Sequence, residues 1–153
     1  MSPQALDELK PLWLALHRHH LAVAEYRWLV QDLQRSWDRR QHWYRELLAN
    51  GGAYFVARGN GQPLGYAMTH TVLGTDDTFD VHTGIVEVVT LVVAESRRAT
   101  GVGSSLLAAV REFAAGHGID MLKVAVMIGN GRAQSFYAKA GFQPAEEVLY
   151  LML

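Results

Sequence analysis

The sequence contains no cysteine, and this absence excludes several kinds of site at once. A chain without thiols cannot form a disulfide, bind a metal through thiolates or use a cysteine nucleophile. It also has no uncharged run of membrane-spanning length and no basic segment leading into an apolar run at its start. We therefore expect a cytoplasmic protein with no membrane partner.

The sequence also has no excess of positive charge. Lys and Arg number 14 against 15 Asp and Glu, which gives a formal net charge of -1. Binding to nucleic acid requires clustered basic residues, so the balance argues against that role, but it leaves a local pocket for a small anion open. With 153 residues, half of them hydrophobic, the chain is expected to form one domain over 1–153.

The first fifty residues predict helices and no obvious strand. Apolar residues recur near the helical period over 3–23, and Pro11 indicates two helices or one helix with a break. Ser36 is expected to cap a helix over 37–49, which Asn50-Gly51-Gly52 would end.

Strands and helices alternate after residue 53. Two apolar runs flank Asn60-Gly61, a pair suited to positive φ, and this pattern predicts a β-hairpin. The other expected elements are a strand over 84–93, a helix over 102–115, a strand over 120–128, a helix over 130–140 and a last strand in the tail 147–153. This order predicts a mixed sheet with helices packed on it.

Two glycines, Gly101 and Gly103, stand at the start of the expected helix, directly after a buried strand. Glycine in a helix costs about 1 kcal/mol relative to alanine, so its presence needs a reason. One reason is a tight turn with close helix packing, and the other is an anion held by the free N–H groups of the first turn. A P-loop is excluded because no lysine follows Gly103, and a dinucleotide fingerprint would need a glycine where Leu106 stands.

Two motifs together resemble a known family. Arg98-x-x-Gly101-x-Gly103, between the strand end Leu-Val-Val and Ser-Ser-Leu-Leu, is similar to the acyl-CoA signature of the GNAT superfamily of N-acetyltransferases. A second recurrent segment of that superfamily resembles Asn130-x-x-Ala133-x-x-Phe136-Tyr137-x-x-x-Gly141-Phe142. The resemblance covers residues 53–153, whereas residues 1–50 match only as generic leading helices.

The resemblance implies an α/β (α+β) fold with a mixed, mostly antiparallel twisted sheet and helices on both faces. The acyl-CoA-binding core would lie within 84–142, and the leading helices 1–50 would form the acceptor side. The fourth and fifth strands of the family's sheet, here 84–93 and 120–127, would splay apart. Because no strand precedes the first helix, the sheet would be one strand shorter than is usual.

The same resemblance implies acetyl-CoA as co-substrate and no metal. The pantetheine arm would lie between the splayed strands, and the pyrophosphate would bind the N–H groups of residues 98–104, with Arg97 and Arg98 adding positive charge. The residues implied in acetyl-CoA binding are Leu91, Val92, Val93, Arg98, Ala99, Thr100, Gly101, Val102, Gly103, Ser104, Asn130 and Tyr137.

Tyr137 and Glu87 are the candidate catalytic residues. By resemblance, the Tyr137 hydroxyl would protonate the leaving thiolate; the alternative is a half-buried tyrosine that holds a loop. Glu87 interrupts an apolar strand, where alternation predicts that it shares a face with Val89, Leu91 and Val93. An alkylammonium with a pKa of about 10.4 needs a base to become a nucleophile. Glu87 would be that base, acting through a water, or else a substrate-binding or structural carboxylate.

His17 and His20 can share one face of the first long helix. They lack a clear third metal ligand, so a surface cluster is favoured over a metal site. By resemblance the leading helices wall the acceptor site, which makes His17, His20, Trp37 and Trp43 candidate acceptor contacts, although core packing suits both tryptophans better. The acids of the loop 74–83 could attract a cationic amine or could simply be solvated.

The function predicted from the resemblance is transfer of an acetyl group from acetyl-CoA to a primary amine of a small molecule by direct attack. The alternatives are an N-acetyltransferase for a peptide or protein N-terminus, and a non-catalytic acyl-CoA-binding sensor. An edge strand and the apolar tail together also allow a homodimer.

Overall fold

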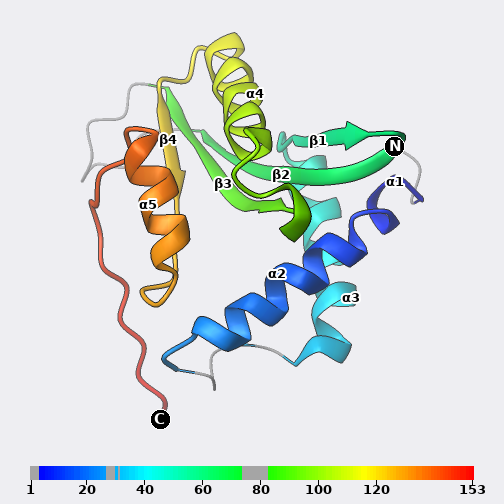
Figure 1. Cartoon of the computed structure of the whole chain (residues 1–153). Coiled ribbons are helices and arrows are strands. Elements are labelled where there is room, and N and C mark those ends of the chain that lie inside the picture. Colours follow the sequence, from blue (N-terminus) through cyan, green and yellow to red (C-terminus); the bar gives the residue numbers. More distant parts are fainter. Residues whose placement is uncertain (1–3, 27–29, 31, 74–82) are drawn as a thin grey trace.

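The computed structural model describes residues 4–26, 30, 32–73 and 83–153. Within them, three helices precede a four-stranded sheet, and two more helices follow its third and fourth strands (Figure 1). The elements are α1 (Gln4–Asp7), α2 (Lys10–Val23), α3 (Leu33–Ala49), β1 (Tyr54–Gly59), β2 (Gln62–Leu73), β3 (Gly84–Val93), η2 (Glu95–Arg97), α4 (Val102–Gly116), β4 (Met121–Val124) and α5 (Gly131–Lys139).

The sheet has the order β1-β2-β3-β4, with antiparallel pairing from β1 to β3 and a parallel pair between β3 and β4. Helix α4 packs on one face, where Leu106, Leu107 and Val110 meet Val86 and Val88 of β3. Helices α2 and α3 pack on the other face through a cluster that includes Trp13 and Tyr44. The predicted mixed sheet with helices on both faces is confirmed.

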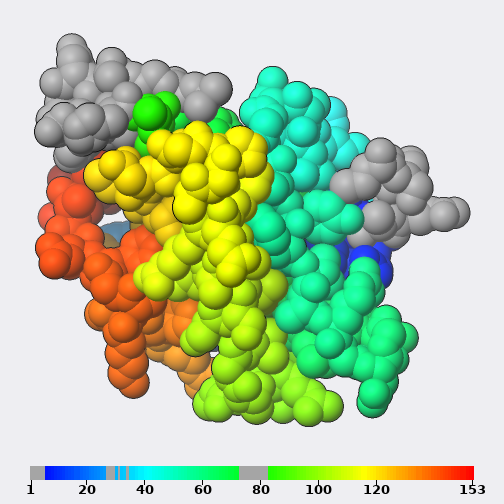
Figure 2. Space-filling view, turned by 90° about the horizontal axis from the view of Figure 1, so that it is seen from above, coloured from blue at the N-terminus to red at the C-terminus, as the bar shows by residue number. Residues whose placement is uncertain are grey.

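Helix α4 runs across the sheet between two other parts of the chain. Figure 2 shows it between the β1–β2 hairpin on one side and the C-terminal segment on the other. Its buried positions, Leu106, Leu107, Val110 and Ala114, recur at intervals of three and four residues, as one face of a helix requires.

The β1–β2 hairpin turns where the sequence predicts. Asn60 and Gly61 both have positive φ, 50° and 77°, between the paired residues Gly59 and Gln62. Two successive residues with positive φ give the turn type that matches the twist of a hairpin.

Strand β3 contains a bulge at Val89. Met68 pairs with Thr90, but the next residue of β2, Thr69, pairs with Val88, so Val89 is the extra residue. Val89 packs against the α2–α3 cluster, and the Thr90 hydroxyl accepts a hydrogen bond from Tyr44 of α3. Two adjacent side chains therefore point to the same face, and the alternation of β3 is reversed beyond them.

The N-terminal helices form as the sequence predicts, except that Ser36 is not the N-cap of α3. Two helices, α1 and α2, occur where a break was predicted, and Pro11 lies in the first turn of α2, where its missing N–H costs nothing. Ser36 does not cap α3, because that helix begins at Leu33. Asp32 accepts the N–H of Arg35 there, while the buried Ser36 hydroxyl accepts a hydrogen bond from the Trp13 indole.

Two strand predictions near the C-terminus are corrected. The strand expected over 120–128 is only Met121–Val124, since the chain leaves the sheet once β3 and β4 diverge. The tail 147–153 forms no strand and runs irregularly outside α5 with its apolar side chains exposed, among them Leu149 and Leu151 (Figure 1). The sequence has strand propensity there, but no neighbouring strand pairs with it in the described chain, and the homodimer remains a prediction.

The junction of α3 with β1 depends on an adjacent pair of glycines. A Cβ on Gly52 would lie 2.5 Å from the Thr69 oxygen and 2.8 Å from the Leu47 oxygen, whereas one on Gly51 would meet nothing within 4 Å. We expect Gly52→Ala to lower the free energy of unfolding by about 2–4 kcal/mol, because the backbone must move. Gly51→Ala should cost about 1 kcal/mol, from its φ of 83° alone. Urea unfolding of both variants measures this, and equal losses would contradict the close packing.

Candidate active site

The parallel pairing of β3 with β4 covers only Ile85–Val88 against Met121–Val124. Beyond Val88 the two chains separate, as the predicted splay requires, and one edge of β3 has no strand beside it in the described structure. The Ala94 N–H donates to the Leu64 carbonyl, on the β2 side. Since neighbouring residues of a strand face opposite edges, Val92 also faces β2, while Leu91 and Val93 direct their backbone groups to the open edge.

The N-terminus of α4 has a series of unused hydrogen-bond donors. Its N-cap, Gly101, has φ 88°, and no side chain caps the helix. None of the backbone N–H groups from Ala99 to Ser104 donates a hydrogen bond to another described residue, and the first helical bond runs from Ser105 to Gly101. Consecutive free donors at the positive end of a helix dipole form a site for an anion.

The two glycines of this turn have different roles. A Cβ on Gly101 would meet nothing within 4 Å, but its φ of 88° disfavours any other residue. A Cβ on Gly103 would lie 3.4 Å from the Phe136 ring and 3.6 Å from the Val93 side chain. Gly101 therefore provides the turn and open access, whereas Gly103 lets α4 approach α5 and β3.

The flanking residues complete this turn. Arg98 is partly exposed, and its guanidinium lies 3.4 Å from Glu95, while the Thr100 hydroxyl donates to the Arg97 carbonyl at 2.6 Å. Ala99 has φ 59°, the left-handed conformation that favours glycine. The backbone over 97–101 is thus held in a tight, solvent-facing turn.

Helix α5 borders the open edge of β3 and begins at a capped residue. Asn130 is buried, and its Oδ1 accepts the Ala133 N–H at 3.2 Å and lies 3.3 Å from His19 Nε2 of α2. This oxygen is occupied by the cap and by the link to α2. A contact of Asn130 with a cofactor remains a prediction.

Tyr137 is buried, with 8% of its surface exposed, between two aromatic neighbours. Its ring packs edge-on against Phe136 and Phe142, with centroids 5.1 and 5.3 Å away. Burial raises the pKa of Tyr137 to about 12, so the phenol stays protonated at neutral pH. Its hydroxyl makes no hydrogen bond with another described residue, which leaves it available as a donor.

Glu87 lies in β3 opposite His70 of β2 and Lys123 of β4. Side chains of paired residues point to one face, so the three form a row across the sheet. The expectation that Glu87 shares a face with Leu91 and Val93 is wrong. The bulge at Val89 places those two on the α4 face, whereas Val89 and, by alternation, Glu87 belong to the α2–α3 face.

An open pocket of about 630 Å³ lies between α2 and α3. It is lined by Trp13, His17, His20, Val30, Ser36, Arg39, Arg40, Trp43, Met127 and Tyr150. His17 and His20 were predicted as acceptor contacts, and both border this space. Trp37 does not border the pocket. Its side chain is only 4% exposed and packs in the core, which is the role that the sequence favoured for it.

Arg40 is surrounded by aromatic rings at the pocket wall. Its guanidinium carbon lies 4.1 Å from the centroid of Trp13, 4.7 Å from that of Trp43 and 5.6 Å from that of Tyr44. Burial lowers the pKa of Arg40, and burial together with the nearby His17, His19 and Arg40 lowers the pKa of His20 to about 4. His20 is therefore neutral at pH 7 beside a cationic arginine.

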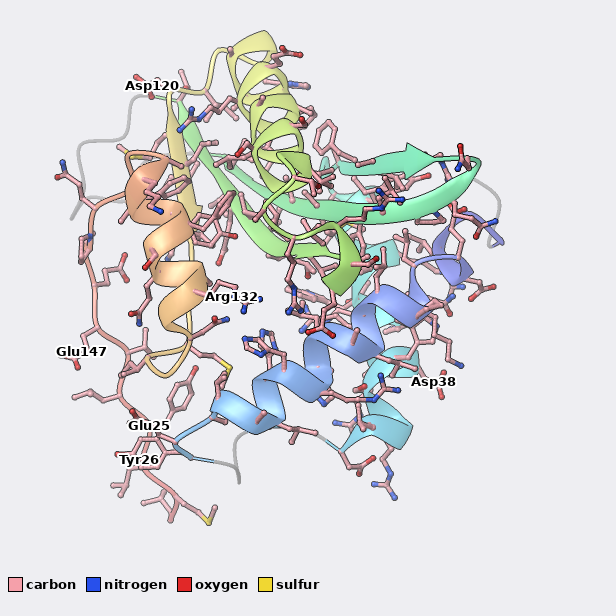
Figure 3. All side chains as sticks on the ribbon, viewed as in Figure 1. Glu25, Tyr26, Asp38, Asp120, Arg132 and Glu147 are labelled. Atoms are coloured by element: carbon pink, nitrogen blue, oxygen red, sulfur yellow. The ribbon has the colours of Figure 1, made fainter. Side chains whose placement is uncertain are left out.

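Sequence reasoning missed Trp13, Arg40 and Met127 of this pocket, and Arg132. The Arg40 and Trp43 spacing of three residues on a helix was a usable signal, but the packing of α2 on α3 was not predictable. Arg132 projects from the first turn of α5 toward α2 (Figure 3).

No helix among the described residues is long and apolar enough to cross a membrane, and no three of their His, Asp or Glu side chains come together as metal ligands. Asp76, Asp77 and Asp80, the acids of the loop 74–83, lie outside the described residues.

Sequence comparison identifies the family. A sequence model of the Acetyltransferase (GNAT) family matches residues 13–142, which is most of the chain. The chain belongs to this family. The uncharacterized N-acetyltransferase YobR of Bacillus subtilis (strain 168) is 35% identical over 80 residues. That match covers 52% of this chain and 31% of YobR, so it spans about a third of the relative's length.

Solved structures share the fold over the whole length of this chain. The tetramutant of BH1408 from Bacillus halodurans superposes with a TM-score of 0.83 at 19% identity, covering 100% of this chain and 97% of the other. The aminoglycoside N-acetyltransferase AAC(6′)-Iy in complex with CoA gives a TM-score of 0.72 at 20% identity, covering 100% and 91%. At these identities the likeness establishes the GNAT fold and no substrate.

The burial of Tyr137 predicts a pH dependence. Its pKa of about 12 in the folded protein exceeds the ordinary value of about 10. Between these values the unfolded chain ionises and the native one does not, so the Tyr137 contribution to stability is constant below pH 10 and is lost as the pH rises toward 12. The difference between the tyrosinate absorbance titrations of wild type and Tyr137→Phe should show one step near pH 12. A step near pH 10 would contradict this burial.

Proposed function

We propose that the chain is an N-acetyltransferase that transfers an acetyl group from acetyl-CoA to a primary amine of a small molecule. The observation that carries the proposal is the combination of an open β3 edge with the free donors at the N-terminus of α4. The amide groups of a pantetheine arm can pair with the open edge of β3, and a diphosphate can bind the free N–H donors of α4. Membership of the GNAT family supports the same reading.

In this proposal the residues of the chain act in three places. The N–H groups of residues 99–104 hold the pyrophosphate, with Arg98 next to them in the same turn. The backbone of Leu91 and Val93 pairs with the pantetheine amides, and an N–H of the same edge stabilises the oxyanion that develops on the thioester carbonyl. Val92 takes no direct part, because its backbone groups bond β2.

The transfer itself is a direct displacement. The amine nitrogen forms a bond with the thioester carbonyl carbon, the carbon–sulfur bond breaks, and its electron pair leaves on the sulfur. Glu87 accepts, through a water, the first proton that the ammonium loses. Tyr137 donates a proton to the departing thiolate and regains one from the nitrogen, which loses its second proton as the amide forms. A phenol with a pKa of about 12 is fully protonated when the thiolate forms, and so it serves as a donor.

The acceptor side of the proposal is the pocket between α2 and α3. Met127 lines the pocket and belongs to the segment that leaves β4, so the pocket opens beside the separated strands. The aminoglycoside N-acetyltransferases among the structural neighbours favour a small-molecule amine over a peptide N-terminus. A peptide N-terminus remains the alternative acceptor.

The first experiment tests the cradle for the pyrophosphate. Gly101→Glu places a carboxylate among the free donors, and we expect it to weaken acetyl-CoA binding at least tenfold, which is about 1.4 kcal/mol. Gly118→Glu is the matched control. Gly118 also has positive φ, 69°, and nothing within 4 Å of a Cβ, but it lies beyond the other end of α4.

Calorimetric titration of acetyl-CoA into both variants and the wild type measures the effect, with circular dichroism as the check on folding. If Gly101→Glu and the wild type bind acetyl-CoA with equal affinity, the pyrophosphate does not bind at this turn. No binding to the wild type would overturn the proposed function.

Substitution of the two candidate catalytic residues distinguishes an enzyme from a non-catalytic acyl-CoA sensor. The double variant Glu87→Gln/Tyr137→Phe should lose at least a hundredfold in kcat, because proton transfer contributes about that much, while acetyl-CoA binding stays within about threefold. Tyr54→Phe on β1, at the far edge of the sheet, is the control. Thiol release with an amine acceptor gives kcat. Unchanged turnover with intact binding would favour the non-catalytic acyl-CoA sensor.

A further inference from the structure

The pocket between α2 and α3 has a charge pattern that narrows its ligand. Two of its lining residues, Arg39 and Arg40, are cationic, and none of the described lining residues is Asp or Glu. His20, on the facing helix, is neutral at pH 7 because its pKa is about 4. The described wall is therefore positively charged, although the whole chain carries a net charge of -1.

The acid nearest to Arg40 in the sequence makes no ion pair with it. Asp38 is two residues from Arg40, which places it on nearly the opposite side of α3. Figure 3 shows Asp38 on the outer side of α3, directed away from α2, and Glu147 on the C-terminal segment; neither lines the pocket. Of the ion pairs between described residues, none includes Arg40.

The aromatic surroundings of Arg40 orient it for a planar anion. The guanidinium lies against the Trp13 and Trp43 rings, 4.1 and 4.7 Å from their centroids. Rings against its plane leave the N–H edge as the part that can donate hydrogen bonds. That edge matches the two oxygens of a carboxylate, which guanidinium groups bind in a bidentate manner.

Most of the other lining residues are apolar or aromatic. Trp13, Trp43, Tyr150, Met127 and Val30 provide rings and aliphatic surface around the arginines. A ligand that fits them carries an apolar or aromatic body next to its anionic group. A polyamine or an aminoglycoside has neither feature, and its positive charges would meet the charge of Arg40.

We propose that the acceptor is an amine that also carries a carboxylate, of the α-amino-acid type with an apolar or aromatic side chain, and that Arg40 binds the carboxylate. This assignment rests on the proposed function, since it names the acceptor of that transfer. Arg40 then determines specificity, and His17 and His20 border the space beside it.

The test uses pairs of amines that differ only by a carboxylate. Phenylalanine and phenethylamine form one pair, tryptophan and tryptamine another, and kanamycin is the polycation. We expect kcat/KM for acetyl transfer from acetyl-CoA to be at least tenfold higher for each amino acid than for its partner and for kanamycin. A preference for the decarboxylated amines or for kanamycin would overturn the assignment.

Substitution of Arg40 locates the effect. Arg40→Gln should raise KM for phenylalanine at least tenfold and change kcat/KM for phenethylamine by less than about twofold. Arg40→Lys keeps the positive charge but lacks the planar guanidinium, so its KM for phenylalanine should lie between those of the wild type and Arg40→Gln. The lysine variant also provides the test if Arg40→Gln does not fold. Arg45→Gln, an exposed arginine of the same helix outside the pocket, should behave as wild type. Equal losses for both amines would show that Arg40 supports the fold and not the carboxylate.

A binding readout separates this proposal from the proposed function. Trp13 and Trp43 line the pocket, so their fluorescence should change saturably with phenylalanine and not with phenethylamine, in the absence of acetyl-CoA. If the protein binds no acetyl-CoA but keeps this response, and loses it in Arg40→Gln, the carboxylate site stands and the transferase does not. If no amino acid gives turnover or a fluorescence response, the carboxylate site is overturned.

Discussion

The separation of β3 from β4 after Val88 is the feature on which the candidate site depends. Strands of a parallel pair normally satisfy each other's backbone groups along their whole length, and here the pairing stops at four residues. The extra residue Val89 lies directly beyond the last pair, and it changes which side chains face each layer of helices. The same short stretch thus opens one strand edge and directs Val89 and Thr90 toward α3.

A buried polar and aromatic group holds the opposite layer in register with that strand. The Tyr44 hydroxyl of α3 donates to Thr90 in β3 and lies 3.2 Å from the Tyr66 hydroxyl of β2. The Tyr44 ring packs edge-on against Trp13 and Tyr66, and Arg40 lies one turn away on the same helix. Because buried hydroxyls must be paired, this network fixes α3 to the bulge and so fixes the pocket wall relative to the open edge.

Much of the binding core was predictable from the sequence, because its signals are local. A glycine before an apolar helix and an Asn-Gly pair between alternating strands each determine backbone geometry over a few residues, and Gly101 and Asn60 occur in the expected conformations. The Ser36 cap and the strand in 147–153 failed because other residues decided them. Asp32 begins α3 earlier, and no described strand pairs with the tail. The pocket was the least predictable part, since it arises where α2 packs on α3, and no residue pattern in either helix alone shows that contact.

The short contact between His19 and Asn130 joins the two halves of the site mechanically. Asn130 begins the helix that carries Tyr137, and His19 stands between the two histidines that line the pocket between α2 and α3. A displacement of the start of α5 would strain this contact with α2. If each compartment binds a ligand, any coupling carried by the contact changes both binding affinities by the same factor, because equilibrium coupling is reciprocal.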